Sequence, residues 1–398
     1  MDFEDIEKRE EEARKYAAAQ AAAGESASPR CTDGMTLREC FQRTMHYQTV
    51  DRIPNFEFGY WEETLGGWHT KGLPDWVVDE MTAYRYFGIE VYRTVGVKAS
   101  HCNIFKPAVI SETEDRIVKR NHMGLVYEST KSGNQSIPHY LEFPVRDWET
   151  WKPFRDHLLA QADILPKKWE EQVQEHLHHD YPLGIDIGSL IGFPRNLLGF
   201  ENTAVMVLTE PELMEDMVET FCVNTLGKLA KALPRLQFDY AAGWEDICFN
   251  SGPIVGVPFF RDVLAPRYKR ITDLLALHGV DIVNTDCDGN LSQVVEHFLA
   301  GGINTMFPVE VHGGTDPVEL RARFGKRLRF WGGVDKMILL RDKAAVDKEL
   351  TRLRPVVEEG GFIPTIDHRV QADADLDLYK HYLDRKREWF RCGGEPMY

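Results

Sequence analysis

The sequence lacks an excess of positive charge. Its 398 residues include 47 lysines and arginines against 63 aspartates and glutamates, which gives a formal net charge of −16. Nonspecific binding to nucleic acids or to anionic membranes needs basic patches, so the charge argues against both classes of partner. No apolar run approaches the ~20 residues that a membrane helix needs. The first residues, Asp2 to Lys8, are acidic, which predicts that they form no signal peptide.

Two common motifs are also missing. The seven cysteines are scattered and none forms a C-x-x-C pair, so a disulfide framework is not expected. Free thiols fit a reducing compartment, and we therefore expect a cytoplasmic protein. No G-x-G-x-x-G loop follows a first strand, which argues against a dinucleotide-binding sheet.

The sequence does contain a regular alternation of short apolar segments and longer helical patterns. Strands separated by helices of this length pair in parallel through right-handed crossovers. Eight such strands would close into a (β/α)8 TIM barrel, and an open doubly wound sheet is the alternative. The strands are predicted at 53–58, 89–95, 182–187, 240–247, 280–285, 303–308, 328–332 and 362–366. The helices are predicted at 75–86, 151–177, 202–233, 258–278, 291–300, 317–324, 343–359 and 374–389.

Two segments depart from this alternation. Residues 1–34 are rich in charge and alanine before a Gly/Ser/Pro linker, and we predict an N-terminal helical extension there. A solvated helix is favoured over a partner-binding one. The barrel domain is predicted at 35–398, starting with a capping-box pattern at Thr36 and Glu39. Within it, residues 108–144 read as an antiparallel β-rich insertion on a βα loop, of the kind that often covers an active site.

Acidic residues follow several predicted strands directly. Asp286 and Asp288 follow the strand at 280–285, and Asp367-His368 follow the strand at 362–366. The carboxyl ends of barrel strands are where such a fold keeps its chemistry. Two carboxylates on one strand face repel unless a metal lies between them or one keeps a proton. Histidine is both a common metal ligand and an acid or base near neutral pH. We therefore predict Asp286, Asp288 and His368 as catalytic residues and as ligands of a divalent metal, with turn formation and helix capping as structural alternatives.

Further candidates lie near other strand ends. Glu245 and Asp246 stand in an otherwise apolar segment, where two acids are costly unless paired or metal-bound. We expect at least one to point into a polar pocket, and predict Glu245 as catalytic. Arg195 is the best candidate for gripping a carboxylate or phosphate. Core packing, capping or ion pairing are the structural alternatives for this set. The predicted substrate-binding residues are Glu57, Tyr60, Trp61, Asp186, Arg195 and Glu310.

At these residues the chain resembles the uroporphyrinogen decarboxylase superfamily, over nearly all of its length after about Thr36. The resemblance rests on several short motifs taken together, and it implies a TIM barrel with its site at the carboxyl ends of the strands. The motifs are Asp51-Arg52-Ile53-Pro54, Gly279-Val280-Asp281, Asp286-Cys287-Asp288-Gly289-Asn290, Gly302-Ile303-Asn304, Pro308-Val309-Glu310, Trp331-Gly332-Gly333-Val334-Asp335-Lys336, Gly360-Gly361-Phe362-Ile363-Pro364 and Asp367-His368.

The superfamily contains two chemistries, and the sequence departs from one of them. True decarboxylases hold the acid groups of a tetrapyrrole with an Arg-rich segment after the first strand, but residues 55–63 of this chain contain no arginine. Corrinoid-dependent methyltransferases form the other branch. Their thiol-activating members bind zinc through a His-x-Cys pair and a final Cys. Aligning the glycine of that motif with Gly289 places Asp286 and Asp288 at the first two positions and His368 at or beside the third.

We therefore expect a methyltransferase that moves a methyl group between a small methylated substrate and a corrinoid protein, with activation by acid or metal. The expected cofactors are a divalent metal, zinc first, and a corrinoid. An oxygen-rich site would be harder than a zinc–thiolate site and would polarise an ether or hydroxyl oxygen. A homodimer is a further expected assembly. One alternative is a decarboxylase or lyase acting on a tetrapyrrole or a small carboxylate, and it requires convergence of Arg93, Lys98, Arg195 and Lys336. The other is a corrinoid- or tetrapyrrole-binding protein without turnover.

Overall fold

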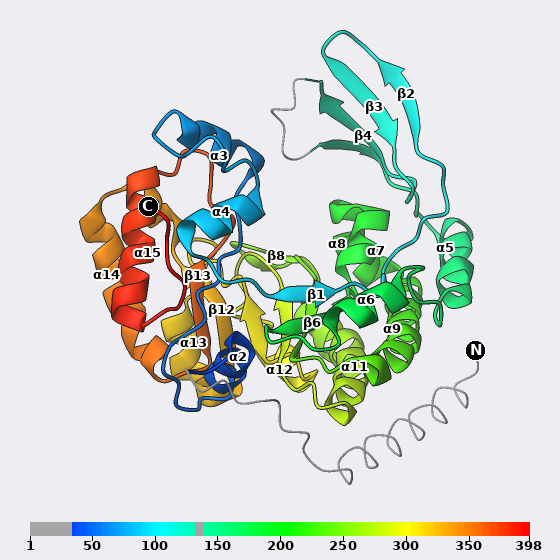
Figure 1. The fold of residues 1–398 in the computed structure, drawn as a ribbon. Coiled ribbons are helices and arrows are strands. Elements are labelled where there is room, and N and C mark those ends of the chain that lie inside the picture. The colour runs from blue at the N-terminus through cyan, green and yellow to red at the C-terminus, as the bar shows by residue number, and fades with distance from the viewer. Residues whose placement is uncertain (1–33, 132–137) are drawn as a thin grey trace.

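The computed structural model describes residues 34–131 and 138–398. Within them, seven parallel strands form one curled sheet flanked by helices (Figure 1). The strands follow the order β1-β6-β7-β10-β11-β12-β13, so each lies beside its successor among the parallel strands. Their bounds are β1 Arg93–Val95, β6 Leu183–Gly188, β7 Tyr240–Trp244, β10 Val283–Asp286, β11 Thr305–Phe307, β12 Arg329–Val334 and β13 Phe362–Ile366. The predicted helical extension at 1–34 lies outside the described residues, apart from Gly34.

The inner and outer faces of the sheet carry different side chains. Successive residues of a strand point to opposite faces. Along β10 and the residues that flank it, Val283 and Cys287 belong to the large outer core beneath the helices, whereas Ile282 belongs to a smaller inner cluster. Asn284 and Asp286 therefore share the inner face with Ile282. The inner cluster is largely aromatic and consists of Phe41, Met45, Phe56, Tyr240, Ile282, Phe307, Trp331 and Ile363.

One helix closes the amino-terminal end of the curl. Helix α2 (Leu37–Met45) places Phe41 and Met45 in the inner cluster. Its carbonyls at Thr44 and Met45 accept hydrogen bonds from residues that start β13 and β12, at 2.7 Å each. Side chains and hydrogen bonds thus close the amino-terminal end of the curl. An active site would therefore lie at the opposite end, where the strands have their carboxyl ends.

The predicted first strand at 53–58 is not a strand of the sheet, and this corrects the expectation of eight paired strands. The segment makes only isolated bridges, from Ile53 to Cys392 and from Tyr60 to Val370. A backbone bond from Glu90 to Asn55, at 2.9 Å, links it to the approach of β1. Two local causes are visible. Pro54 has no N–H to donate, and the Ile366 N–H at the end of β13 donates to the carboxylate of Glu57 rather than to a main-chain carbonyl.

The helices cover the outer face of the sheet. Helix α9 contacts β6, and α14 contacts β12 and β13. Several predicted long helices are divided; for example, the stretch 202–233 breaks where Pro211 starts α9, because proline fits the first turn of a helix but not its interior. The helix bounds are α3 Glu62–His69, α4 Glu80–Phe87, α5 Trp148–Ala160, α6 Trp169–His176, α7 Gly192–Leu198, α8 Phe200–Thr209, α9 Pro211–Ala232, α10 Val257–Phe259, α11 Ala265–Leu277, α12 Val295–Ala300, α13 Pro317–Phe324, α14 Lys343–Glu358 and α15 Leu376–Phe390.

The segment predicted as a β-rich insertion forms a separate four-stranded antiparallel sheet. Its strands are β2 Ala108–Glu112, β3 Arg116–Arg120, β4 Val126–Thr130 and β5 His139–Glu142, paired in that order. In Figure 1 this sheet projects from the body on the side opposite α2. It therefore stands at the end of the molecule where the parallel strands terminate.

None of the helices in the described part combines the length and the apolarity needed to span a lipid bilayer. Each cysteine within the described ranges carries a free thiol.

Candidate active site

Acids from two neighbouring strands meet at the carboxyl edge of the sheet. Asp286 ends β10, Asp288 lies two residues beyond, and Asp246 follows β7. The backbone joins the two strand ends, because the Glu245 N–H donates to the Asp286 carbonyl at 2.9 Å. Burial raises the pKa of Asp286 well above its ordinary value, and repulsion from Asp288 and Asp246 adds to the effect. Asp286 is thus placed to hold a proton.

His368 completes this edge from β13. Its Nε2 lies 3.4 Å from Oδ2 of Asp288, so a protonated imidazole forms an ion pair with that carboxylate. The ring of Trp61 stacks on the imidazole with centroids 5.4 Å apart and an interplanar angle of 21°. Phe58 approaches the same imidazole at 5.7 Å. The structure therefore brings together Asp286, Asp288, His368 and Trp61, four of the residues predicted from the sequence.

The aromatic rings nearest these polar groups belong to the inner cluster or pack directly against it. Phe58 packs edge-on against Phe307 with centroids 4.5 Å apart, and Phe307 pairs in register with Asp286. Tyr92 contacts Trp331 at 4.7 Å and Phe56 at 5.0 Å. We call Phe56, Phe58, Tyr92, Phe307 and Trp331 the aromatic floor.

Asp246, rather than its neighbour Glu245, points to the acidic edge. Its backbone has φ 48, a left-handed conformation that is uncommon for a non-glycine residue. Arg195 donates to its carbonyl oxygen and lies 3.4 Å from its Oδ2, while the guanidinium also stacks over Trp244 at 5.1 Å. Burial raises the pKa of Asp246, and Arg195 opposes that effect. Arg195 is therefore bound to an acid of the site and is not free to grip a substrate carboxylate.

Glu245 has a different role from the catalytic one predicted. Its side chain is buried, and its oxygens accept hydrogen bonds from the N–H groups of Leu190, Ile191 and Gly192 at 2.8–2.9 Å. The hydroxyls of Ser189 and Tyr268 donate to the same carboxylate. These contacts satisfy the free N–H groups at the start of α7. With five donors bound, the carboxylate has no capacity left for a substrate, and it acts as an anchor for the loop after β6.

The side chain of Glu57 is likewise held in the interior, and so is the hydroxyl group of Tyr60. The Glu57 carboxylate accepts from Lys386 Nζ and from the Tyr382 hydroxyl, at 2.7 Å each, and neither member of the ion pair is exposed. The hydroxyl of Tyr60 lies 3.0 Å from that of Tyr379. These bonds attach the irregular segment 53–60 to α15. The prediction that Glu57 contacts substrate is therefore replaced by a structural role.

The remaining predicted residues are occupied by local contacts. Glu310 pairs with Lys336 at 2.7 Å and also accepts from the Gly289 N–H. Asp186 accepts from the Gly188 N–H at 2.8 Å, and burial raises its pKa. Lys336 and Arg195 are thus each balanced by an acid. Two of the four cations that the decarboxylase alternative requires are already neutralised.

Two residues beside His368 were not among the predicted site residues. Asp367 is fully buried and accepts from the backbone N–H groups of Val311 and Lys336; burial raises its pKa to about 7. Arg369 donates to the Tyr60 carbonyl at 2.9 Å and to Glu80 at 3.0 Å. Both flank His368 in sequence, so adjacency to a candidate residue was the available signal.

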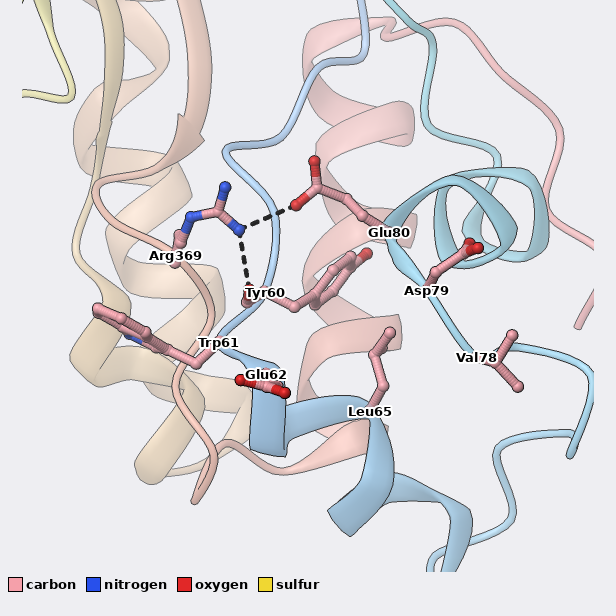
Figure 2. A pocket seen from close by; sticks show the side chains of 8 residues that line it. All are labelled: Tyr60, Trp61, Glu62, Leu65, Val78, Asp79, Glu80 and Arg369. Atoms are coloured by element: carbon pink, nitrogen blue, oxygen red, sulfur yellow. Dashed lines mark hydrogen bonds and ion pairs between the residues drawn. The ribbon is translucent and has the colours of Figure 1, made fainter. Parts of the chain in front are cut away.

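Arg369 also borders a pocket of about 420 Å³ on the outer side of Trp61. Figure 2 shows its Arg369–Glu80 ion pair and the bond from Arg369 to the main chain of Tyr60. The lining is mixed, with carboxylates at the starts of two helices and an apolar wall. It is formed by Tyr60, Trp61, Glu62, Leu65, Val78, Asp79, Glu80 and Arg369. Trp61 thus lines this pocket and also stacks on His368.

The predicted metal ligands do not fit a metal site. In the part of the chain that the structure describes, no three His, Cys, Asp or Glu side chains converge as a cation would require. Asp288 is directed to His368, while no hydrogen bond or ion pair from a described residue reaches the carboxylate of Asp286. The groups that this edge offers for chemistry are therefore its own acids and its imidazole.

Comparisons with known proteins find similarity among solved structures. No family model matches the chain, and no curated protein matches it. Among solved structures, the fold is similar to a methyltransferase from Methanosarcina mazei, with a TM-score of 0.55 and 13% sequence identity. The alignment covers 89% of this chain and 99% of that one. At this identity the likeness concerns the fold: the described chain shares the architecture of that methyltransferase over nearly the whole length of both.

Proposed function

We propose that this chain is a methyltransferase of the uroporphyrinogen decarboxylase superfamily that moves a methyl group between a small methylated substrate and a corrinoid protein. The sequence motifs and the fold likeness support the class. The observation that carries the chemistry is Asp286, a carboxyl with a raised pKa and no bonding partner among the described residues, at the carboxyl edge of β10. The site thus offers a proton where a reacting group would sit.

A proton in this place serves methyl transfer directly. A methyl group on oxygen or nitrogen leaves its heteroatom only when that heteroatom can accept the bonding electron pair. A general acid within hydrogen-bond reach stabilises the developing charge, and its efficiency depends on a pKa near the working pH. Asp286 would supply this proton. Asp288 and His368 form the adjacent pair that fixes the electrostatic surroundings, and Trp61 holds the imidazole in place by stacking.

The surface near the site fits a large partner with an apolar face. Phe249 follows the end of β7 and is 49% exposed, and its ring packs edge-on against Phe200 with centroids 4.6 Å apart. The Phe249 carbonyl accepts from the Asn290 N–H at 2.9 Å, which places it beside the Asp286–Asp288 loop. When bound, a reduced corrinoid supplies the nucleophile that takes up a methyl group. Exposed aromatic rings beside the acids are consistent with the approach of such a macrocycle.

The test is a spectrophotometric methyl-transfer assay. Purified protein is incubated with reduced cobalamin and, separately, with methylated amines, methoxylated aromatics and methyl thioethers, and formation of methylcobalamin is followed. We expect one donor class to react, and Asp286→Asn to lower the rate about a hundredfold or more, the size of a general-acid contribution. Asp273→Asn is the matched control, since this acid is exposed on α11 and, among the described residues, pairs with Lys269 alone. If correctly folded protein methylates cobalamin with none of the donors, the proposal fails.

A further inference from the structure

A second pocket lies at the amino-terminal end of the curl, on the side opposite to the acidic edge. Its volume is about 510 Å³, which is within the range of small-molecule sites. Its walls come from α12, from the turn Gly325–Arg327 after α13, and from Arg329 at the start of β12. Its lining shares no residue with the acidic edge, so a ligand here would be separate from the reacting groups.

Positive charge is concentrated in this part of a strongly acidic chain. Residues 321–329 contain five lysines and arginines and no acid, although the whole chain carries a net charge of −16. Three of these cations, Lys326, Arg327 and Arg329, line the pocket, and Glu296 is the one acid in its lining. The lining therefore has an excess of two positive charges. A cavity lined mainly by charges of one sign concentrates ions of the opposite sign.

Two cations of the turn differ in their partners. Arg327 lies 3.5 Å from Glu296, and both side chains are more than half exposed, so this ion pair is weak. Lys326 makes no ion pair or hydrogen bond within the described chain. The turn thus offers one ammonium group without a counterion and one guanidinium group that a stronger anion can take from Glu296.

Arg329 is fixed in place but keeps donors for a ligand. Its Nε donates to the Met45 carbonyl at 2.7 Å, and no hydrogen bond from its other two nitrogens reaches a described residue. The nearest acid is Asp281, which is already paired with His46 at 2.9 Å. That pairing is the main reason for the lowered pKa of Asp281, and the charge of Arg329 contributes to it. The guanidinium of Arg329 therefore remains available to an anion.

One aromatic ring holds two of these cations side by side. Nζ of Lys326 lies 5.3 Å from the centre of the Tyr47 ring, and the guanidinium carbon of Arg329 lies 5.9 Å from it. Each such contact contributes about 0.5–1 kcal/mol at an exposed site. Tyr47 has φ 58, which is uncommon for a bulky residue, and its hydroxyl is bound to the Leu328 carbonyl at 2.7 Å. The ring thus keeps two like charges close together with no acid between them.

The charge and the walls of the pocket favour a phosphate monoester. A phosphate monoester carries about −1.5 to −2 charges at pH 7, which matches the excess of two positive charges, whereas one carboxylate carries a single charge. Guanidinium and ammonium groups are the side chains that bind phosphate oxygens. Leu299 and Ala300 of α12 add an apolar wall, against which the organic part of the ligand can pack.

We propose that this pocket binds a small phosphate monoester, with its phosphate on Lys326, Arg327 and Arg329 and its organic part against α12. Nucleoside monophosphates and sugar or glycerol phosphates share this chemistry. The proposal goes beyond methyl transfer and does not depend on it. Glu296 competes with the phosphate for Arg327, so removing its charge should tighten binding.

Calorimetry at constant ionic strength tests the proposal. Adenosine monophosphate and glycerol 3-phosphate are titrated into the full chain, with adenosine, glycerol, inorganic phosphate and succinate for comparison. We expect at least one monoester to bind about tenfold more tightly than succinate or inorganic phosphate, and its phosphate-free parent not to bind. The monoester that binds identifies which organic part the pocket accepts.

Variants of exposed residues locate the binding site. Lys326→Met and Arg327→Met should each weaken binding about tenfold, the effect of losing a hydrogen bond to a charged group. Glu296→Gln should tighten it about two- to fivefold, since it removes a weak competing pair. Lys348→Met is the control, because Lys348 is exposed on α14 away from the pocket lining. Urea unfolding of each variant confirms that it is folded.

Four results would overturn the proposal. They are no binding of either monoester at millimolar concentration, binding by succinate as tight as that of the monoesters, binding by inorganic phosphate as tight as both, and an unchanged affinity in the double variant Lys326→Met/Arg327→Met. Because methyl transfer is not measured in these titrations, each result leaves the proposed methyltransferase function to its own test.

Discussion

Nε2 of His368 and Oδ2 of Asp288 face each other at 3.4 Å, joining the loop after β13 to the loop after β10. Because the stacked ring of Trp61 fixes the plane of the imidazole, this pair is ordered from two sides. It is the contact on which the electrostatics of the site depend most directly.

Removing the imidazole should therefore impair transfer rather than folding. We expect His368→Ala to lower the rate of methylcobalamin formation about a hundredfold, because Asp288 loses the imidazole beside it and its negative charge then acts more strongly on Asp286. His381→Ala is the control, since His381 on α15 makes a comparable pair with Asp347 on α14, at 2.9 Å. A similar loss of rate in both variants would assign the effect to general destabilisation.

The raised pKa values of two buried acids predict how the stability of the folded protein depends on pH. Burial raises the pKa of Asp367 to about 7 and that of Asp286 well above its ordinary value. The folded state binds these protons more tightly than the unfolded state, so their stabilising effect is present at low pH and is lost as the pH rises from their ordinary pKa toward about 7. Urea unfolding between about pH 5 and about pH 8 should show this decline, and Asp286→Asn should flatten it and stabilise the protein at the upper end. An unchanged slope in Asp286→Asn would contradict the assignment.

Removing one member of the buried pair between Glu57 and Lys386 should strongly destabilise the protein. Lys386→Met leaves an uncompensated carboxylate in the interior and should cost about 3–5 kcal/mol, whereas the double variant Glu57→Leu/Lys386→Met should recover much of that loss. Arg235→Met removes an exposed pair with Glu170 and should change the unfolding free energy little. Chemical denaturation measures all three. Equal losses from the buried and the exposed pair would show that the interior pair is not what holds segment 53–60.

Glu245→Gln should show whether Glu245 only anchors the loop after β6 or also takes part in catalysis. The amide keeps the shape of the side chain but has one acceptor oxygen for five donors, so we expect a loss of about 2–4 kcal/mol in stability. Below its unfolding transition the variant should still methylate cobalamin within severalfold of the parent. A loss of rate as large as that of Asp286→Asn, in a fully folded variant, would restore Glu245 to the catalytic set.

Elemental analysis tests the metal expectation. Because Asp286, Asp288 and His368 do not converge on one point in the described structure, purified protein should contain no stoichiometric zinc. Methyl transfer should proceed unchanged after treatment with a chelator. One bound divalent ion per chain, removed together with activity, would reverse this conclusion.

The sequence predicted the elements that follow from a local pattern of apolar and polar residues. The strand at 362–366 was predicted with its observed bounds, because an apolar run between Gly361 and Asp367 has only one interpretation. Asp286, Asp288 and His368 were placed together because the carboxyl ends of parallel strands share one edge.

The sequence did not predict the structural roles of Glu57 and Glu245, because the residues that they contact are distant in sequence. Glu57 meets Lys386 across 329 positions, and Glu245 meets Ser189 across 56. No local pattern reveals either contact. Of two adjacent acids, only the left-handed backbone at Asp246 decides which one faces the site. The same long-range bond explains the missing strand at 53–58, since the Glu57 side chain takes a donor that a regular ladder would use.

Helix α2 fills the amino-terminal end of the curl with Phe41 and Met45, so the acidic edge faces the opposite end. In the proposed reaction, a small donor and a bulky corrinoid protein would both have to approach the acids from that end. The donor therefore has to enter before the protein partner docks, and the demethylated product leaves only after that partner departs. Steady-state kinetics should accordingly follow a compulsory order, with an excess of the corrinoid protein acting as an inhibitor by trapping the empty enzyme.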